Sequence, residues 1–537
     1  MFEQKFSTLV ELYDNSVCKY SGNECFSVYG KEKLTFHDFS LRVDHLRNIL
    51  SENGINLEDK VILLGQNMPN WGAGYFATVK SGSVIVPVLP DFSEDEVNGI
   101  ISHSDAKAII ISKRQLKKLS EESREKLDVI ILMDDLSLIK RCNNKSASKK
   151  DYIPASDDIA AIIYTSGTTS KPKGVMLTHN NLCSQLAMVE DLHKVVADDV
   201  FLSILPLSHT YECSLGMLLP FMHGASVVYI EKPPTANILL PILKEIRPTT
   251  ILSVPLIIEK IYKNKILAQI NEKSLIRKIY STKSGRKLLN KILGIKLKQT
   301  FGGRVRFFGI GGSKLDPIVE RFLYEAEFPY AIGYGLTETA PLIAGVSTST
   351  VKIQSTGPQL KGVELRILNP NPQTGEGEII AKGPNIMAGY YKNEEATKEA
   401  FTEDGWFRTK DLGVFDKKGY LYIKGRLGNM ILGASGENIY PEEIEHVING
   451  HSMVVDSLVK EEKGKLVALV QFNKEELEKK YDSMKDSLEQ KIETLKLELM
   501  HYVNSKVNRF SRISLVVEQA NTFEKTPTHK IKRFLYQ

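Results

Sequence analysis

The side chains best suited to bind a ligand lie in a loop rich in hydroxyl groups, glycines and lysines. Residues 158–164 (DIAAIIY) have the apolar character of a short buried strand, and residues 165–174 (TSGTTSKPKG) form the loop that follows. Glycine lets the backbone approach a ligand, hydroxyl groups donate hydrogen bonds, and lysines offset negative charge. We interpret the loop as a polyphosphate site rather than a mobile Ser/Thr/Gly linker, because a strand precedes it and Lys-Pro-Lys-Gly ends it. The candidate binding residues are Thr165, Ser166, Gly167, Thr168, Thr169 and Lys173.

The loop is not a Walker motif, because no Gly-Lys-Ser/Thr follows Gly167 at the spacing that motif requires. Its order of residues, Tyr-Thr-Ser-Gly-Thr-Thr through Pro-Lys-Gly, resembles the signature of the adenylate-forming superfamily. That superfamily includes acyl-CoA synthetases, the adenylation domains of peptide synthetases and firefly luciferase. The resemblance implies that the loop binds the phosphates of ATP and that Thr165 lies beside a Mg²⁺ ion.

Two further glycine-rich segments follow in the order of that superfamily. Residues 308–315 (FGIGGSKL) end an apolar run, as a strand passing close under a flat ligand requires. The resemblance makes Gly311, Gly312 and Ser313 an adenine-side loop. By the same resemblance, residues 333–339 (GYGLTET) have three roles. Tyr334 stacks on adenine beside Gly335, Thr337 binds the α-phosphate, and Glu338 ligates Mg²⁺ as a hard oxygen donor.

A carboxylate and an arginine in the next segment complete the implied nucleotide site. Asp411, in residues 404–413 (DGWFRTKDLG), corresponds to the acceptor of the ribose hydroxyls, and Arg426 shares that contact. Each segment has an ordinary reading as a turn, a helix start or a hairpin tip. Their occurrence together and in order, across residues 164–530, makes coincidence untenable.

The last segment, residues 523–533 (FEKTPTHKIKR), matches the terminal loop of the superfamily. By position Lys530 is the catalytic lysine, which the resemblance places against the carboxylate oxygen and the α-phosphate during adenylation. A preorganised donor of this kind typically lowers a barrier by ~3–4 kcal/mol. A solvated basic tail is the alternative, and the Thr-Pro-Thr-x-Lys-Ile frame argues against it.

Two further positions are implied for the second half of the reaction. His209, in Pro-Leu-Ser-His-Thr-Tyr-Glu, matches a position near the carboxylate and the thiol entry, although a lone histidine after a strand is more often structural. Residues 433–438 (GASGEN), with Gly436, are implied to line the approach of the coenzyme A thiol, since glycines leave room for a narrow pantetheine arm.

Length and composition fit a globular protein of two or three packed units, with 537 residues, 42% of them hydrophobic and 25% charged. Apolar strand-like pieces alternate with amphipathic stretches up to about residue 330, which predicts an α/β fold with mainly parallel layered sheets. We predict a large N-terminal adenylate-forming domain over 1–425, with an antiparallel barrel-like subdomain over about 351–425. A smaller mobile C-terminal α/β domain over 426–537 then carries Lys530, begins a helix at Pro441 and contains a long charged helix around 474–507.

No run of about 18 apolar residues and no signal-peptide pattern occurs, so we expect a protein that stays in the cytoplasm or on the cytoplasmic membrane face. The five cysteines form no C-x-x-C pair and do not cluster with histidine, which argues against a zinc site or a disulfide frame.

Basic residues gather in one stretch of the chain. Residues 260–298 hold twelve Lys/Arg and one acid, so this segment has a net charge of +11. The whole chain has a net charge of +5, so the remaining residues together carry −6. Its apolar residues recur at helical spacing at Ile266, Leu267, Ile270, Leu275, Ile276, Ile279 and Tyr280. The stretch can lie on an anionic membrane surface, dock an acidic acyl carrier protein, or be a solvated surface over a core stripe. Nucleic acid is disfavoured because no base-reading motif accompanies the charge.

These features together predict an AMP-forming, ATP-dependent acyl-CoA ligase, closest to the long-chain fatty acyl-CoA synthetases, that uses Mg²⁺ and coenzyme A. Its substrate is then a medium- or long-chain fatty acid. Ligation to an acyl carrier protein, or of an aryl acid to coenzyme A, is the alternative within enzymes. A non-catalytic acyl- or nucleotide-binding protein is the alternative of another class, and the joint presence of Lys173, Glu338, Asp411, Arg426 and Lys530 counts against it.

Overall fold

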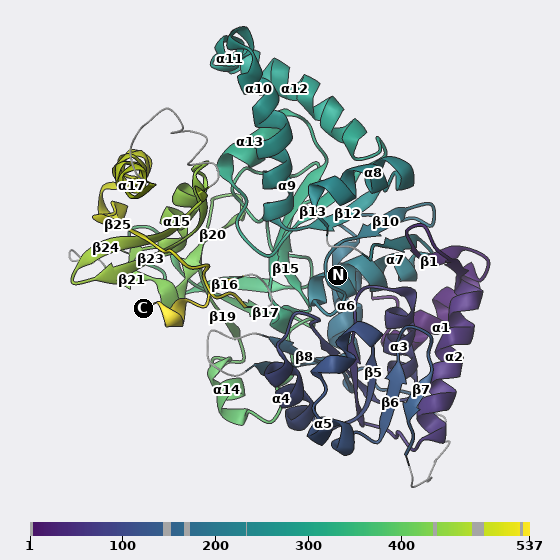
Figure 1. Cartoon of the computed structure of the whole chain (residues 1–537). Helices are drawn as coiled ribbons and strands as arrows, with labels where there is room; N and C mark the ends of the chain where they lie inside the picture. Colours follow the sequence, from purple (N-terminus) through teal and green to yellow (C-terminus); the bar gives the residue numbers. More distant parts are fainter. Residues whose placement is uncertain are drawn as a thin grey trace.

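The structure is a computed structural model that describes residues 4–142, 152–165, 172–231, 234–432, 438–474, 488–526 and 530–536. Within these residues it contains two eight-stranded sheets, a four-stranded sheet, a three-stranded sheet and a two-stranded ribbon. The two large sheets and their helices fill one side of the molecule, and the three-stranded sheet lies apart from them towards the C-terminus (Figure 1). This arrangement confirms the predicted α/β class.

The first large sheet carries the strands that lead into the predicted site. Its pairs are parallel except at the two edges, where β2 and β15 run antiparallel. In spatial order its strands are β15 (Leu342–Gly345), β14 (Tyr330–Gly335), β13 (Phe307–Ile310), β12 (Thr250–Ser253), β10 (Val200–Ser203), β11 (Ser226–Tyr229), β1 (Glu24–Val28) and β2 (Lys33–Thr35).

The second large sheet carries the hydroxyl-rich loop. Its central pairs are parallel, whereas β7, β9 and β18 run antiparallel to their neighbours. In spatial order its strands are β18 (Gly389–Tyr390), β9 (Lys173–Thr178), β8 (Ile159–Thr165), β4 (Val84–Val88), β3 (Lys60–Leu64), β5 (Ala106–Ile111), β6 (Val129–Leu132) and β7 (Leu138–Lys140).

Helices pack on and between these sheets. Pro69–Val79 of α3 is buried throughout, and this helix contacts strands of both large sheets, so its sequence reads apolar on every face. The helices up to residue 325 are α1 (Leu9–Tyr20), α2 (Phe36–Glu52), α3 (Pro69–Lys80), α4 (Glu94–Ser104), α5 (Glu121–Lys126), α6 (His179–Val189), α7 (Leu219–Met222), α8 (Ala236–Ile246), α9 (Pro255–Ile261), α10 (Ala268–Glu272), α11 (Ser274–Tyr280), α12 (Lys283–Thr300) and α13 (Pro317–Glu325).

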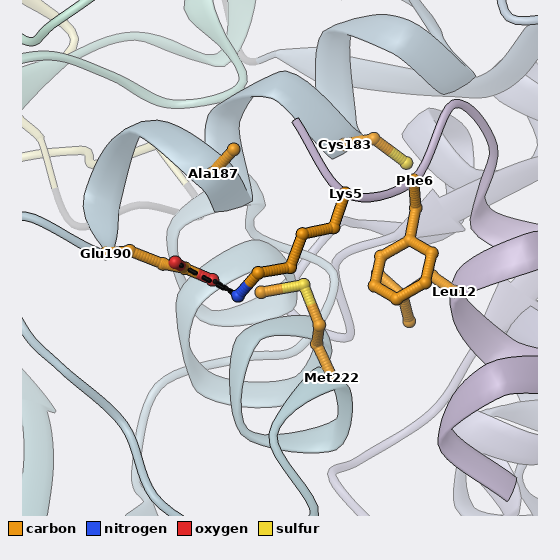
Figure 2. A pocket seen from close by; sticks show the side chains of 7 residues that line it. All are labelled: Lys5, Phe6, Leu12, Cys183, Ala187, Glu190 and Met222. Carbon is orange, nitrogen blue, oxygen red and sulfur yellow. Dashed lines mark hydrogen bonds and ion pairs between the residues drawn. The ribbon is translucent and has the colours of Figure 1, made fainter. Parts of the chain in front are cut away.

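The segment before α1 is held against α6 and α7. Lys5 Nζ lies 2.9 Å from a carboxylate oxygen of Glu190, and Phe6 points towards Leu12 beside Cys183 (Figure 2). The cavity between them has a volume of about 10 Å³. A space of that size holds about one water molecule, so we regard it as a packing gap.

The four-stranded sheet is antiparallel throughout and shares the apolar core of the large sheets. Its strands are β16 (Glu364–Leu368), β17 (Gly377–Lys382), β19 (Phe407–Phe415) and β20 (Leu421–Arg426), and α14 (Glu394–Glu399) lies between β18 and β19 in the chain. Asp411 and Arg426 are directly opposite each other in the β19–β20 ladder.

Residues 439–516 contribute to a separate apolar core, built by β23 (Val454–Glu462), β24 (Lys465–Phe472), β25 (Leu515–Glu518), α15 (Pro441–Asn449) and α17 (Leu488–Asn504). A two-stranded ribbon, β21 (Ile431–Leu432) and β22 (Asn438–Ile439), precedes α15. We refer to residues 1–426 as the large unit and to the residues after 426 as the small unit; the predicted domain boundary stays a prediction. The predicted helix start at Pro441 is confirmed. Of the helix predicted around 474–507, the described part is α17.

Candidate functional site

The predicted site residues meet where strands of the first large sheet end. β10, β13 and β14 are parallel strands, and the chain leads from their carboxyl ends to His209, Gly311 and Gly335. Ligands of open α/β sheets bind at this edge, outside the carboxyl ends of the strands. The four-stranded sheet adds Asp411 and Arg426, and the chain end adds Lys530.

A hydrogen-bonded triad forms one wall of the site. Tyr334 Oη donates to Asp411 Oδ2 over 2.7 Å, and Arg426 Nε lies 3.0 Å from Asp411 Oδ1. The register of β19 and β20 fixes the Asp411–Arg426 pair, since cross-strand partners are neighbours on one face. Burial raises the pKa of Asp411, whereas Arg426 and the tyrosine hydroxyl lower it. Asp411 in turn raises the pKa of Arg426.

A second group connects the predicted metal ligand to the hydroxyl-rich loop. Tyr390 Oη donates to Glu338 Oε1 over 2.9 Å, and the Lys173 ammonium lies 5.1 Å from the centre of the Tyr390 ring. Tyr390 belongs to β18, which pairs with β9, the strand that begins at Lys173. Because Thr165 is opposite Lys173 in the β8–β9 ladder, the two ends of the loop are held side by side.

A side chain would collide at one of the predicted glycines, Gly335, and would fit only tightly at another, Gly311. A Cβ on Gly335 would come within 1.8 Å of the Pro341 carbonyl oxygen, so the backbone that carries Tyr334 and Thr337 is closely packed on the next strand. A Cβ on Gly311 would come within 3.3 Å of the Tyr211 ring. Gly312 has a φ of +92°, a conformation that favours glycine, and Ser313 beside it is exposed.

His209 lies at the same edge, half-buried between β10 and a π-helix (Glu212–Leu218). Burial lowers the pKa of His209 to about 4, and the positive charge of Lys530 acts in the same direction. His209 is therefore neutral at pH 7 and can exchange hydrogen bonds with a bound group without adding charge.

Lys530 reaches this edge from the opposite end of the chain. It keeps an exposed surface, yet the surrounding protein and the Arg426 guanidinium lower its pKa, while Asp411 and Glu338 raise it. Its charge thus acts on groups from both the sheet and the loop. The backbone holds its loop closed, because Thr526 N donates to Lys530 O over 2.7 Å and Lys530 N donates to Thr526 Oγ1 over 3.2 Å.

Polar contacts join the two units beside the site. Tyr440 Oη donates to Glu376 Oε2 over 2.8 Å, and Lys424 Nζ lies 3.0 Å from the same carboxylate. Two looser pairs reach across from α15, Glu443 with Lys314 and His446 with Asp316, each at 3.8 Å. The contacts of Tyr440, Glu443 and His446 tie α15 and the residue before it to the large unit, and the ion pair of Arg533 with Glu445 ties the segment that carries Lys530 to α15.

The structure therefore links Tyr334, Asp411 and Arg426 with one another, Glu338 through Tyr390 with Lys173 and Thr165, and Lys530 electrostatically with His209, Asp411, Arg426 and Glu338. Gly311, Gly312, Ser313, Gly335 and Thr337 lie at or just after the ends of β13 and β14. The other predicted residues, Ser166, Gly167, Thr168, Thr169 and Gly436, lie outside the described residues. Their assignments stay predictions.

Sequence reasoning missed Tyr390 and Tyr211. Tyr390 belongs to a two-residue strand in Met-Ala-Gly-Tyr-Tyr, where no local pattern ties it to Glu338. Tyr211 was read only as part of the segment around His209. A tyrosine two residues from a candidate site histidine was a usable signal, since a buried tyrosine needs a partner or a ligand for its hydroxyl.

The described part of the chain holds no group of three or more His, Cys, Asp or Glu side chains that could together bind a metal ion. Among the same residues, no helix has both the length and the apolar character needed to cross a bilayer.

Comparison with known proteins gives consistent results. A model of the AMP-binding enzyme family matches residues 14–391. Long chain acyl-CoA synthetase 6, peroxisomal, of Arabidopsis thaliana is 33% identical over 442 residues, which cover 74% of this chain and 62% of that protein. Fatty acyl-CoA synthetase B of Dictyostelium discoideum is 27% identical over 500 residues, covering 83% of this chain and 74% of that protein. The chain thus spans about 62% of the length of the plant relative.

Solved structures share the fold. ATP-bound MatB from Rhodopseudomonas palustris superposes with a TM-score of 0.77 at 21% identity, over 98% of both chains. O-succinylbenzoate coenzyme A synthetase from Bacillus subtilis, in complex with ATP and a magnesium ion, gives 0.76 at 21% identity, over 97% of this chain and 98% of that one.

Proposed function

The chain belongs to the family of AMP-binding enzymes, and from that premise we propose that it is an AMP-forming, ATP-dependent acyl-CoA ligase. Its substrate is a medium- or long-chain fatty acid, which it activates as an acyl-adenylate and transfers to the thiol of coenzyme A. The observation that carries this proposal is the approach of Lys530 to the Tyr334–Asp411–Arg426 wall. A protein that only bound nucleotide would need the wall and not the lysine. The names of the relatives support the fatty-acid assignment.

In the first step an oxygen of the fatty-acid carboxylate attacks the α-phosphorus of ATP in line. The bond from that phosphorus to the bridging oxygen breaks, and pyrophosphate leaves with the electron pair. Such reactions are catalysed by positioning and by neutralising charge. In the proposed mechanism Asp411 and Arg426 hold the ribose, Tyr334 stacks on the base, and Lys530 neutralises charge between the carboxylate and the α-phosphate.

The residues around Glu338 fit a magnesium ion that arrives with ATP. Mg²⁺ is usually bound through one or two carboxylates together with substrate phosphates, so a single acidic side chain is sufficient. The Tyr390 hydroxyl occupies one Glu338 oxygen and leaves the other free of any hydrogen-bond partner among the described residues. Bound there with Thr165 nearby, the ion would offset phosphate charge. Lys173, over the Tyr390 ring, faces the same phosphates from the opposite strand.

In the second step the coenzyme A thiol attacks the acyl carbonyl, and AMP leaves with the electrons of the broken carbonyl–oxygen bond. Lys530 must first withdraw, which the small unit achieves by turning about the segment after Arg426. The looser pairs at 3.8 Å support this proposal. The exposed pair of Glu443 with Lys314 is of a kind that contributes only about 0–1 kcal/mol. Burial lowers the pKa of His446, which disfavours the charged imidazole and so weakens its contact with Asp316. A rotated small unit would bring residues 433–438 to the thiol.

The acyl chain is proposed to run between β13 and the π-helix that follows His209. Gly309 and Gly311 have no side chain to fill this space, and the partly buried Tyr211 ring packs over both. Each methylene buried in such an apolar channel contributes about 0.8 kcal/mol. A long acid therefore gains affinity only where the channel continues past Tyr211.

The acceptor and the location are further parts of the proposal. Coenzyme A is the proposed acceptor, and an acyl carrier protein is the alternative, since the basic stretch 260–298 offers a surface to an acidic protein. The proposed location is the cytoplasm, with peripheral attachment to the cytoplasmic membrane face through the same stretch.

A pyrophosphate-release assay tests acid and acceptor together. Fatty acids of increasing length and aryl acids are offered with ATP and Mg²⁺, in the presence of coenzyme A or of acyl carrier protein. Release that depends on a medium- or long-chain acid, with thioester formed on coenzyme A, supports the proposal. Release with aryl acids alone, or thioester formed only on the carrier protein, favours the alternatives. No release with any acid would contradict ligase activity.

A further inference from the structure

The basic stretch folds into helices that project from the large unit. α10, α11 and α12 form the outermost part of the molecule beyond α13 (Figure 1). Ile266 and Ile270 are buried in the core under α13, so the reading of these residues as a core stripe is correct for the start of the stretch. Leu275 and Ile279 of α11 are instead exposed, and α11 has no buried residue.

α12 has two apolar faces, and only one of them is covered. Leu293, Gly294 and Leu297 face the protein, and Gly294 packs so closely that a Cβ would come within 2.3 Å of the Ala326 carbonyl oxygen. Leu288, Ile292 and Ile295 are 61%, 45% and 62% exposed. Their spacing of four and three residues places them on one helix face, opposite the buried one. A leucine and two isoleucines thus form an outward stripe, which we call the α12 stripe.

Lysines border the α12 stripe. Helix geometry places Lys287, Lys291 and Lys298 along one side of it and Lys296 along the other. Lys291 is paired with Glu327 at 2.7 Å, while Lys287, Lys296 and Lys298 have no salt-bridge partner among the described residues. The sequence between residues 273 and 300 contains no acidic residue at all. Like charges without counter-charges repel one another, so an anionic partner would stabilise this face.

We propose that the outward face of α12 is a membrane-docking face that binds anionic phospholipid. An amphipathic helix lies in the interface with its apolar face in the acyl boundary and its lysines at the headgroups, and each lysine near such a surface contributes about 1 kcal/mol. Lysine stems can extend past a buried apolar stripe to reach phosphates. A nucleic acid would bind the lysines but would leave the apolar α12 stripe exposed to water. Docking is separate from ligase chemistry, because none of these residues belongs to the site.

Vesicle co-sedimentation of the full chain tests this, without ATP or fatty acid, so its outcome does not depend on the proposed activity. The protein should sediment with phosphatidylcholine vesicles that contain phosphatidylglycerol and stay in solution with phosphatidylcholine alone. Raising the salt to about 1 M, where the screening length is about 3 Å, should release most of it. Equal binding to both vesicles, or binding to neither, overturns the proposal whatever the variants do.

Two triple variants separate charge from apolar contact. K287E/K296E/K298E should lower partitioning onto anionic vesicles at least about 100-fold. L288S/I292S/I295S should also lower partitioning onto anionic vesicles. It should do so even in low salt, where the lysines still attract the lipid, because this variant loses apolar contact and keeps its charge. The matched control K417E/K418E/K463E changes the same charge at exposed lysines elsewhere and should bind nearly as the parent does. Circular dichroism and the thermal unfolding midpoint, which do not depend on the proposed activity, report that each variant is folded.

Two further results would show that the outward face of α12 is not the docking site. One is unchanged vesicle binding by both triple variants, which would place any membrane contact elsewhere. The other is loss of vesicle binding in the control to the same extent, which would show a response to net charge alone. If the parent binds immobilised acyl carrier protein and not anionic vesicles, and K287E/K296E/K298E loses that binding, the face serves an acidic protein instead.

Discussion

The two units of the molecule present their charged site groups in different ways. In the large unit, Asp411 is fixed by Tyr334 at 2.7 Å and by Arg426 at 3.0 Å, on adjacent strands of one sheet. In the small unit, Lys530 has no salt-bridge partner among the described residues, and its loop is closed by two bonds with Thr526. The wall is thus held together before any substrate arrives, while no ion pair among the described residues holds the ammonium that faces it.

The difference follows from the two steps of the proposed reaction. Groups that bind ribose and phosphate are needed in both steps, so holding them in place costs no reorganisation at the moment of reaction. A lysine needed only for adenylation would obstruct the thiol afterwards. The proposed reaction has two successive attacks at one site, first by the carboxylate and then by the thiol. It therefore requires nucleotide-binding residues that stay in place and a lysine that can withdraw.

Removing the lysine should have the largest effect. Lys530→Ala should slow pyrophosphate release about 10²- to 10³-fold, because a preorganised donor of this type is worth ~3–4 kcal/mol. Thioester formation from supplied acyl-adenylate should stay within a few-fold of the parent, since Lys530 has withdrawn by then. Stopped-flow or quench measurements of each half-reaction check both values. Lys532→Ala, two residues on, is the matched control, and a variant that adenylates normally would remove Lys530 from the mechanism.

Breaking the fixed wall should come next. Asp411→Asn leaves the Arg426 guanidinium without its counter-charge and weakens the ribose site, so kcat/KM for ATP should fall about 30- to 150-fold, or ~2–3 kcal/mol. Unlike Lys530→Ala, it should impair both half-reactions, because the nucleotide is held throughout. Asp416→Asn, which removes the partner of Lys352 in the turn after the same strand, is the control. Loss confined to adenylation would refute a shared role for the wall.

The local parts of this site could be predicted from the sequence. Buried strands appear as short apolar runs, so the strand before the hydroxyl-rich loop was placed within a residue of β8. Proline followed by Glu442 and Glu443 marked the start of α15, because proline suits the first turn and acids suit its positive end. Each of these signals is carried by neighbouring residues.

The parts that depend on distant pairing could not be predicted. Tyr390 reaches Glu338 only because a two-residue strand adds to β9, and nothing local encodes that register. The helical spacing of apolar residues in 260–298 likewise does not reveal whether an apolar helix face points into the core or towards solvent. Ile266 and Ile270 proved to be core, whereas the exposed stripe lies further along at Leu288, Ile292 and Ile295.

The two units also differ in how a buried glutamate affects the pH dependence of folding stability. Burial raises the pKa of Glu212, beside the site, from 4.5 to about 8, and Glu212 has an oxygen without a hydrogen-bond partner among the described residues. In the small unit burial raises the pKa of Glu445 only to about 7, because Arg533 opposes it. The raised value means that Glu212 supports the fold fully below pH 4.5 and that this support is lost as pH rises towards 8.

Glu212→Gln should therefore flatten the pH dependence of unfolding. The parent should lose up to about 1.4 kcal/mol of unfolding free energy per pH unit from this group between pH 5 and 8, and the variant should not. Urea denaturation at several pH values, compared with the exposed control Glu399→Gln, measures the difference. A constant offset between parent and variant across this range would mean that Glu212 is ionised in the folded protein.

The contact that joins the two units should give the smallest effect. Tyr440→Phe removes the hydroxyl that donates a hydrogen bond to Glu376, so the contact between the two units loses one partly buried hydrogen bond, about 1–1.5 kcal/mol. Adenylation should fall about 5- to 10-fold, while thioester formation from supplied acyl-adenylate should stay level or rise, because the small unit is released more readily. Tyr420→Phe, which removes an exposed tyrosine hydroxyl bonded within the large unit, is the matched control. Equal loss in both half-reactions would mean that Tyr440 supports the fold of the small unit rather than its orientation.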